Sequence, residues 1–172
     1  EELNRRKVVV YTHPATPNCC ADIMPYISIN AIEGPVDTTR TMISLIFQGG
    51  AARYPDIRWI FSHSGGTTPF LLSRFIRQEQ DMKGEAIKRM PNGVMYEYKK
   101  FYYETAQGNH AGALDALLRI IPISQVLFMS NTLHYGHRLC ACVLAVSTAL
   151  LAFVTLPACL VLRPALQSLR AP

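Results

Sequence analysis

The chain has 172 residues, of which 49% are hydrophobic and 17% charged, so a disordered or fibrous protein is excluded and a packed core needs no disulfides. Its net charge is +5, but all twelve acidic residues lie at or before Asp115, whereas the last 57 residues hold four arginines and no acid. This basicity belongs to an acid-free tail rather than to a lysine- and arginine-rich face, so no nucleic-acid partner is expected. Five cysteines in no metal-ligand spacing indicate buried or free thiols in a reducing compartment, which favours a cytoplasmic protein.

Short β-branched or apolar runs alternate with segments of helical periodicity. Strands are predicted at residues 7–12, 57–62, 101–105 and 125–129, helices at 37–52, 68–80 and 111–121, and a long loop at 81–100. This alternation is typical of βαβ units with a parallel sheet. The fold class is therefore α/β, and the four β/α units predict a partial (β/α)8 TIM-type barrel, because a complete one needs about 250 residues.

The C-terminal tail differs in character from the rest of the chain. Residues 139–162 are 24 consecutive uncharged and mostly apolar residues, long enough for a membrane-spanning helix. Two other interpretations stay open: a pair of core helices broken at Pro157, or translated sequence foreign to the rest of the gene. We expect two parts, a barrel portion at 1–130 and an apolar helical tail at 131–172, with membrane association through 139–162 as the alternative location.

Polar side chains follow the predicted strands. His13, His63 and Asn131 each lie just past a strand end, and Glu104 lies close to the end of another. In a (β/α)8 barrel the active site is built at the carboxyl ends of the strands. These residues are therefore expected to meet at one edge of the sheet.

Five segments carry a resemblance to a known family. They are Val8–Pro14 (VVVYTHP), Asp37–Arg40 (DTTR), Arg53–Ile60 (RYPDIRWI), Ser62–Gly66 (SHSGG) and Phe101–Ala106 (FYYETA). In this order they resemble the amidohydrolase-related family, and within it the aminocarboxymuconate-semialdehyde decarboxylase-like branch. The resemblance extends over residues 7–128 and covers the C-terminal half of such a protein.

The resemblance implies a metal-dependent barrel and a role for three residues. His13 matches a strand-end ligand of a divalent metal, usually zinc, with manganese as the other possibility. His63 matches the histidine of an H-x-G-G turn that acts as a catalytic acid or base. Arg74 lies where similar enzymes bind a substrate carboxylate, sometimes across a subunit contact. The structural alternatives are a histidine that caps a loop, a histidine bonded to backbone and a solvated helix arginine.

The chain also departs from the family pattern. The His-x-His strand that supplies two metal ligands is not found, and Asn131 stands where a metal-binding aspartate is expected. The function implied is a metal-dependent decarboxylase of aromatic or unsaturated carboxylic acids, in truncated form. A hydrolase of the same family and a catalytically inactive remnant are the alternatives. The expected partners are a small carboxylic acid as substrate and either a second copy of the chain or a missing N-terminal half.

Overall fold

The computed structural model describes residues 1–15, 20, 25–129 and 144–145. Within them a five-stranded sheet has the order β1 (Val9–Thr12), β2 (Arg58–Phe61), β3 (Tyr102–Glu104), β4 (Val126–Phe128), β5 (Leu144–Ala145). The first three pairings are parallel, whereas β5 runs antiparallel to β4. The predicted α/β class with a parallel sheet is confirmed, and each of the four predicted strands is present.

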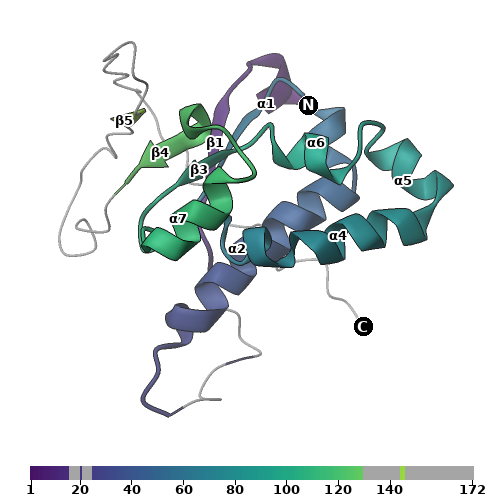
Figure 1. The fold of residues 1–172 in the computed structure, drawn as a ribbon. Coiled ribbons are helices and arrows are strands. Elements are labelled where there is room, and N and C mark those ends of the chain that lie inside the picture. The colour runs from purple at the N-terminus through teal and green to yellow at the C-terminus, as the bar shows by residue number, and fades with distance from the viewer. Residues whose placement is uncertain (16–19, 21–24, 130–143, 146–172) are drawn as a thin grey trace, which may run out of the picture.

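Helices connect the strands. They are α1 (Glu2–Arg5), α2 (Ile29–Phe47), α3 (Gly50–Arg53), η2 (His63–Gly65), α4 (Thr68–Met82), α5 (Gly84–Arg89), α6 (Val94–Tyr98), α7 (Ala111–Leu118) and η3 (Ile123–Gln125). Figure 1 shows the strands gathered to one side of the helices, with α5 and α6 at the end farthest from β4 and β5. The core forms where the apolar side of α2, including Met42 and Ile46, packs with Phe61, Tyr103 and Val126 of the strands.

Two predicted boundaries are wrong. The segment 81–100 is not a loop but holds α5 and α6, because Met90, Val94 and Tyr98 are buried and hold it against the rest of the molecule. The helix predicted from residue 37 begins at Ile29 instead. Asp37 consequently lies inside α2 and does not cap it.

The apolar tail is described only at residues 144–145. These two residues form β5, a strand, so the helix predicted over 139–162 is wrong at this point. The rest of that segment, the domain boundary at 130 and Asn131 lie outside the described residues. Among the described residues, no helix is long and apolar enough to cross a membrane.

A buried pair of tyrosines ties the core to the turn after β2. The Tyr103 hydroxyl donates to the carbonyl oxygen of Tyr98 at 2.7 Å, and the Thr68 hydroxyl donates to the carbonyl oxygen of Gly65 at 2.7 Å. Because the single proton of Thr68 is used in that bond, the Tyr98 hydroxyl donates to Thr68 across 3.0 Å. Burial raises the pKa of Tyr98 to about 12 and that of Tyr103 well above its usual value.

These two tyrosines should ionise above the ordinary tyrosine range, because burial raises the pKa of both. The folded state favours their neutral phenols, so this stabilisation is present in full below pH 10, the ordinary tyrosine pKa, and is lost as pH rises through about 12. Ultraviolet titration of phenolate should show a late phase that Tyr98→Phe reduces and Tyr96→Phe leaves intact. A single phase near pH 10 with native circular dichroism would contradict this.

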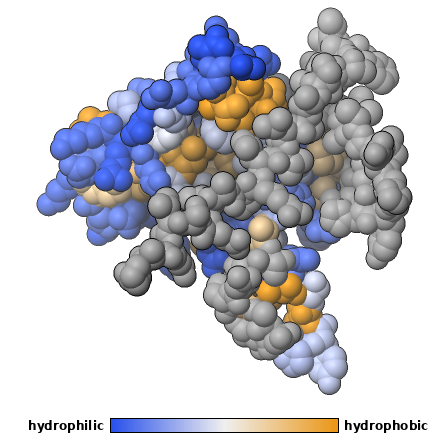
Figure 2. Space-filling view, turned by 180° about the vertical axis from the view of Figure 1, so that it is seen from behind, coloured by the Kyte–Doolittle hydropathy of each residue, from blue (hydrophilic) through white to orange (hydrophobic). Residues whose placement is uncertain are grey.

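The outer edge of β1 leaves an end of the sheet without a neighbouring strand in the described part of the chain. β1 pairs with β2 alone, and Val9 is 37% exposed. Figure 2, seen from behind relative to Figure 1, shows hydrophobic surface on this side of the molecule. Unpaired strand edges with apolar side chains associate with other chains.

The chain expressed alone is therefore expected to oligomerise or aggregate. Val9→Lys should reduce the association, because a charge on an edge strand disfavours pairing with a second edge. Ile87→Lys is the matched control, since Ile87 is 69% exposed on α5, away from the sheet edge. Light scattering measures the difference, and a monodisperse monomer of the unmodified chain would contradict the expectation.

Candidate active site

Parallel register brings the two predicted histidines together. Thr12 of β1 pairs with Phe61 of β2, and each strand is followed within two residues by its histidine. The ring centroids of His13 and His63 lie 5.2 Å apart, with the rings edge-on at 70°. His13 is exposed, with its Nδ1 3.1 Å from the carbonyl oxygen of Pro14, whereas His63 is buried with 8% exposure. The meeting of strand-end residues predicted from the sequence is thus observed for this pair.

The turn that carries His63 has an unusual backbone. Four successive residues have positive φ: His63 (54°), Ser64 (55°), Gly65 (77°) and Gly66 (65°). Glycine adopts this region freely, but a residue with a side chain pays about 1–2 kcal/mol for it. Such strain persists only where surrounding contacts hold it in place.

Helix α2 supports one side of this turn. The Thr39 hydroxyl donates to the carbonyl oxygen of Pro35 and accepts the Thr67 N–H at 2.9 Å. The hydroxyl groups of Thr38 and Ser62 lie 3.2 Å apart in the core. Within the segment Asp37–Arg40, the two threonines thus contact the loops at the site.

The outer residues of the same segment bind elsewhere. The Asp37 carboxylate accepts the Ala15 N–H at 3.0 Å, two residues after His13. Arg40 forms its ion pair with Glu33 at 3.5 Å. Asp37 therefore holds the backbone that follows β1, while Arg40 forms an ion pair with another residue of α2.

Glu104 supports the turn from the other side. It lies at the end of β3 with no exposed surface, and its Oε1 accepts the His63 N–H at 2.8 Å and the Tyr11 hydroxyl at 3.3 Å. Its Oε2 accepts the Ala106 N–H at 2.6 Å. Burial raises the pKa of Glu104, and the hydrogen bonds from Ala106, His63 and Tyr11 oppose this rise.

The role of Glu104 does not follow from its position in the sequence alone. An acid at the end of a predicted strand is a signal for a site, but it does not say which backbone group the carboxylate will bind. Tyr11 gives still less indication, since an aromatic residue in a strand is ordinarily part of a core.

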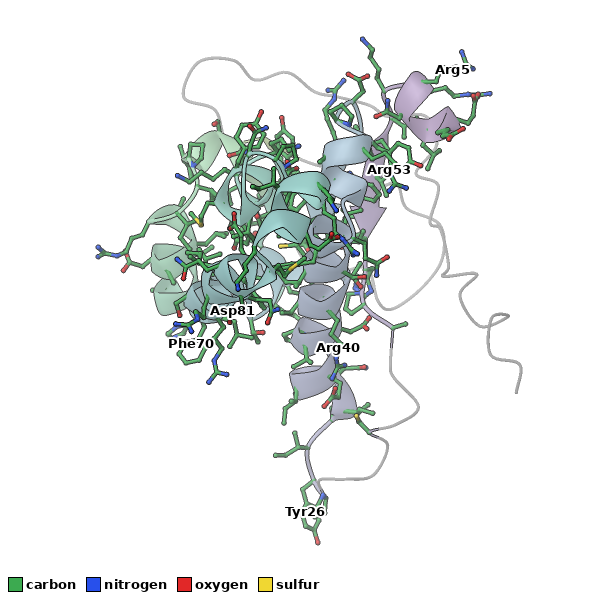
Figure 3. The ribbon with its side chains drawn as sticks, turned by 90° about the vertical axis from the view of Figure 1, so that its right-hand side faces the viewer. Arg5, Tyr26, Arg40, Arg53, Phe70 and Asp81 are labelled. Carbon is green, nitrogen blue, oxygen red and sulfur yellow. The ribbon has the colours of Figure 1, made fainter. Side chains whose placement is uncertain are left out.

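A cavity of about 420 Å³ lies beside the turn, on the side of α4 and α7. Its lining includes His63, Ser64 and Phe70, and Phe70 is 86% exposed at the start of α4. Figure 3 shows Phe70 pointing outward. No arginine or lysine is among the described residues that line this cavity, so it offers no cation for a carboxylate.

Arg74, which the resemblance assigns to a substrate carboxylate, is exposed on α4, the helix that follows the turn. Its assignment stays a prediction.

The described residues do not complete a metal site. His13 and His63 supply two neighbouring imidazoles, but no group of three or more histidine, cysteine or acidic residues that could hold a metal occurs within residues 1–15, 20, 25–129 and 144–145. Catalytic zinc sites normally use three protein ligands. The ligand set implied by the resemblance is thus not met by this part of the chain.

Comparison with known proteins supports the resemblance. The chain is 37% identical over 113 residues to the decarboxylase yanB of Aspergillus niger, covering 62% of this chain and 30% of that protein. It is 30% identical over 132 residues to the 6-methylsalicylic acid decarboxylase acuB of Aspergillus aculeatus, covering 76% and 40%. The chain therefore spans well under half the length of these curated relatives. No protein-family model matches it.

Solved structures agree on the fold. A dihydroxybenzoic acid decarboxylase from Polaromonas sp. JS666, with bound manganese and the inhibitor 2-nitroresorcinol, matches with a TM-score of 0.61 at 18% identity. The match covers 76% of this chain and 41% of that structure. The sheet and its helices are thus arranged as in part of that protein.

Gly66 offers a test of how tightly the turn is held. A Cβ at Gly66 would collide with the carbonyl oxygen of Pro35 and lie 2.8 Å from Thr39 Oγ1, at a φ of +65°. Gly66→Ala should lower the free energy of unfolding by at least about 2 kcal/mol. Gly84→Ala is the control, because nothing lies within 4 Å of its Cβ position, and it should be neutral or slightly stabilising. Urea unfolding followed by circular dichroism measures both, and equal effects would contradict a constrained turn.

Proposed function

The chain is a member of the amidohydrolase-related family, in its aminocarboxymuconate-semialdehyde decarboxylase-like branch, and we propose that it is the C-terminal part of a decarboxylase of aromatic carboxylic acids. The observation that carries the proposal is the pair of strand-end histidines, with ring centroids 5.2 Å apart. The names of its relatives favour a decarboxylase over a hydrolase.

His63 is the proposed proton donor. In a decarboxylation the bond between the ring carbon and the carboxylate breaks, the electron pair stays on the ring carbon and CO₂ leaves. The ring carbon then takes a proton, which a histidine can supply near neutral pH. The imidazole left neutral recovers its proton from solvent, so the residue acts again in the next turnover.

His13 is the proposed ligand of a divalent metal. The manganese in the solved decarboxylase supports manganese as the ion, while the expectation of zinc has no support of its own. The described residues do not complete the ligand set. The further ligands would come from a segment outside this chain and from position 131, where the amide oxygen of Asn131 would bind without a negative charge.

Arg74 is proposed to bind the substrate carboxylate only across a contact between two copies. Its exposure on α4 leaves the guanidinium available for that contact. A planar guanidinium binds a carboxylate through two parallel hydrogen bonds.

A catalytically inactive remnant is the second candidate. The incomplete ligand set and the neutral Asn131 favour it, because a metal site that loses charged ligands loses affinity. The two candidates predict different results when the missing segments are supplied: a decarboxylase releases CO₂, and an inactive remnant does not.

The test supplies those segments separately. We expect the purified chain with manganese to release no CO₂ from 6-methylsalicylate or 2,6-dihydroxybenzoate. Mixing it with the N-terminal part of the Aspergillus niger relative should give decarboxylation. His63→Asn should then lower the rate about 100-fold or more, because a general acid contributes at least that much.

Two controls complete the experiment. Asn131→Asp should raise both metal retention after dialysis and the rate, since it restores the carboxylate of the family pattern. His110→Asn should leave the rate unchanged, because His110 caps α7 through a bond to Gly112 N and is not in the pair. Release of CO₂ that does not depend on His63 would overturn its role, and a mixture that binds metal without releasing CO₂ would favour the inactive remnant.

A further inference from the structure

Glu104 is the one fully buried acid at the candidate site. It has no exposed surface, and no ion pair among the described residues includes it. Its carboxylate instead accepts hydrogen bonds from three neutral donors, the N–H groups of His63 and Ala106 and the hydroxyl of Tyr11. Burying a carboxylate without a cation costs folding free energy, which hydrogen bonds offset only in part. A carboxylate in this place therefore indicates a role that an apolar side chain could not fill.

The three donors come from three separate segments. Tyr11 is on β1, His63 is in the turn after β2, and Ala106 follows β3. The side chain of Glu104 thus joins the carboxyl ends of three adjacent parallel strands at one point. Two of these ends carry the histidines, since His13 comes two residues after Tyr11.

The bond to His63 acts on a backbone that would otherwise relax. His63 and Ser64 both have positive φ, which side chains disfavour. An N–H bonded to a carboxylate is held more strongly than one bonded to a neutral acceptor. Because φ of His63 sets the direction of its Cα–Cβ bond, a backbone held at this φ also sets the point from which the imidazole extends.

We propose that Glu104 is a positioning residue, whose carboxylate holds the His63 imidazole against that of His13. An effect of Glu104 on catalysis rests on the proposed function, in which His63 supplies the proton. The positioning of His63 by Glu104 does not depend on that function. Ser64 adds a second bond to the segment after β3, since its hydroxyl donates to the carbonyl oxygen of Gly108 at 2.9 Å.

Glu104→Gln tests the proposal with little change in shape. The amide keeps one acceptor oxygen but places an NH₂ group against a backbone N–H, so one of the two backbone bonds must break. Glu97→Gln is the matched control. Glu97 is also a buried glutamate, with 1% of its side chain exposed, but it lies on α6 and forms an ion pair with Lys100. The two variants lose a buried carboxylate alike and differ in whether it bonds to His63.

The readout is nuclear magnetic resonance of the 172-residue chain with ¹⁵N-labelled histidine, with every sample carrying Val9→Lys to limit association. With Glu104 and Glu97 unchanged we expect a cross-peak between the rings of His13 and His63 and slow hydrogen exchange of the His63 amide. Glu104→Gln should abolish the cross-peak and accelerate that exchange at least tenfold, while Glu97→Gln should change neither. Tyr11→Phe removes the 3.3 Å bond to Glu104 and the 3.6 Å bond to Met129 Sδ but keeps the Glu104 carboxylate. It should shift the His63 ring signals, and it tests the proposal where Glu104→Gln fails to fold.

The outcomes separate this proposal from the proposed function. Loss of the cross-peak in Glu104→Gln alone supports positioning, even where no sample releases CO₂ and the decarboxylase proposal falls. In the reconstituted mixture, Glu104→Gln should lower kcat at least tenfold with KM unchanged. A retained cross-peak in Glu104→Gln, or its equal loss in Glu97→Gln, overturns the positioning role.

Discussion

The left-handed turn at His63–Gly66 is the constraint around which the described site is arranged. Its two residues with side chains cost about 2–4 kcal/mol together. A hydrogen bond to a charged acceptor returns about 1.5–3 kcal/mol and a neutral one about 1. The bonds from His63 N to Glu104 and from Ser64 Oγ to Gly108 O are therefore of the right size to hold the turn.

The turn also explains features of the fold that lie outside it. Helix α2 starts earlier than its hydrophobic periodicity predicts and keeps Pro35 in its interior, although proline there removes a helix hydrogen bond. The carbonyl oxygen of Pro35 is bonded by Thr39, whose hydroxyl in turn binds Thr67 N at the exit of the turn. The additional helical turns of α2 thus place a scaffold beside Gly66, where no side chain fits.

How much of the fold the sequence predicts depends on the kind of signal. The strands are found because β-branched runs such as Val8–Val10 alternate with helical periodicity, and strand order follows from the parallel rule. The segment 81–100 is misjudged because α5 and α6 are short, and because Gly93, which lies between the two helices with a φ of 84°, is a loop signal in the sequence. Their helical state depends on tertiary contacts such as Val94 N to Glu79 Oε2, which local sequence does not reveal.

The candidate site divides in the same way. The proximity of His13 and His63 can be predicted, because both follow neighbouring parallel strands. The bond from His63 N to Glu104 cannot, since it depends on the left-handed φ of His63, a conformation that only a few per cent of residues other than glycine adopt. The role of Arg74 was assigned by resemblance alone, and its exposed position on α4 leaves that role a prediction.

The two halves of the proposed chemistry are unequally represented in the described residues. The proton-transfer half is built: His63 is buried, its backbone is fixed from β3 and α2, and its ring faces a second imidazole. The metal half is not, because His13 has no third ligand near it within the described ranges. Strained backbone is kept where neighbouring groups overdetermine it, and here those groups all belong to this chain. The contacts that hold the turn at His63 are thus made by described residues of this chain, among them Glu104 and Gly108.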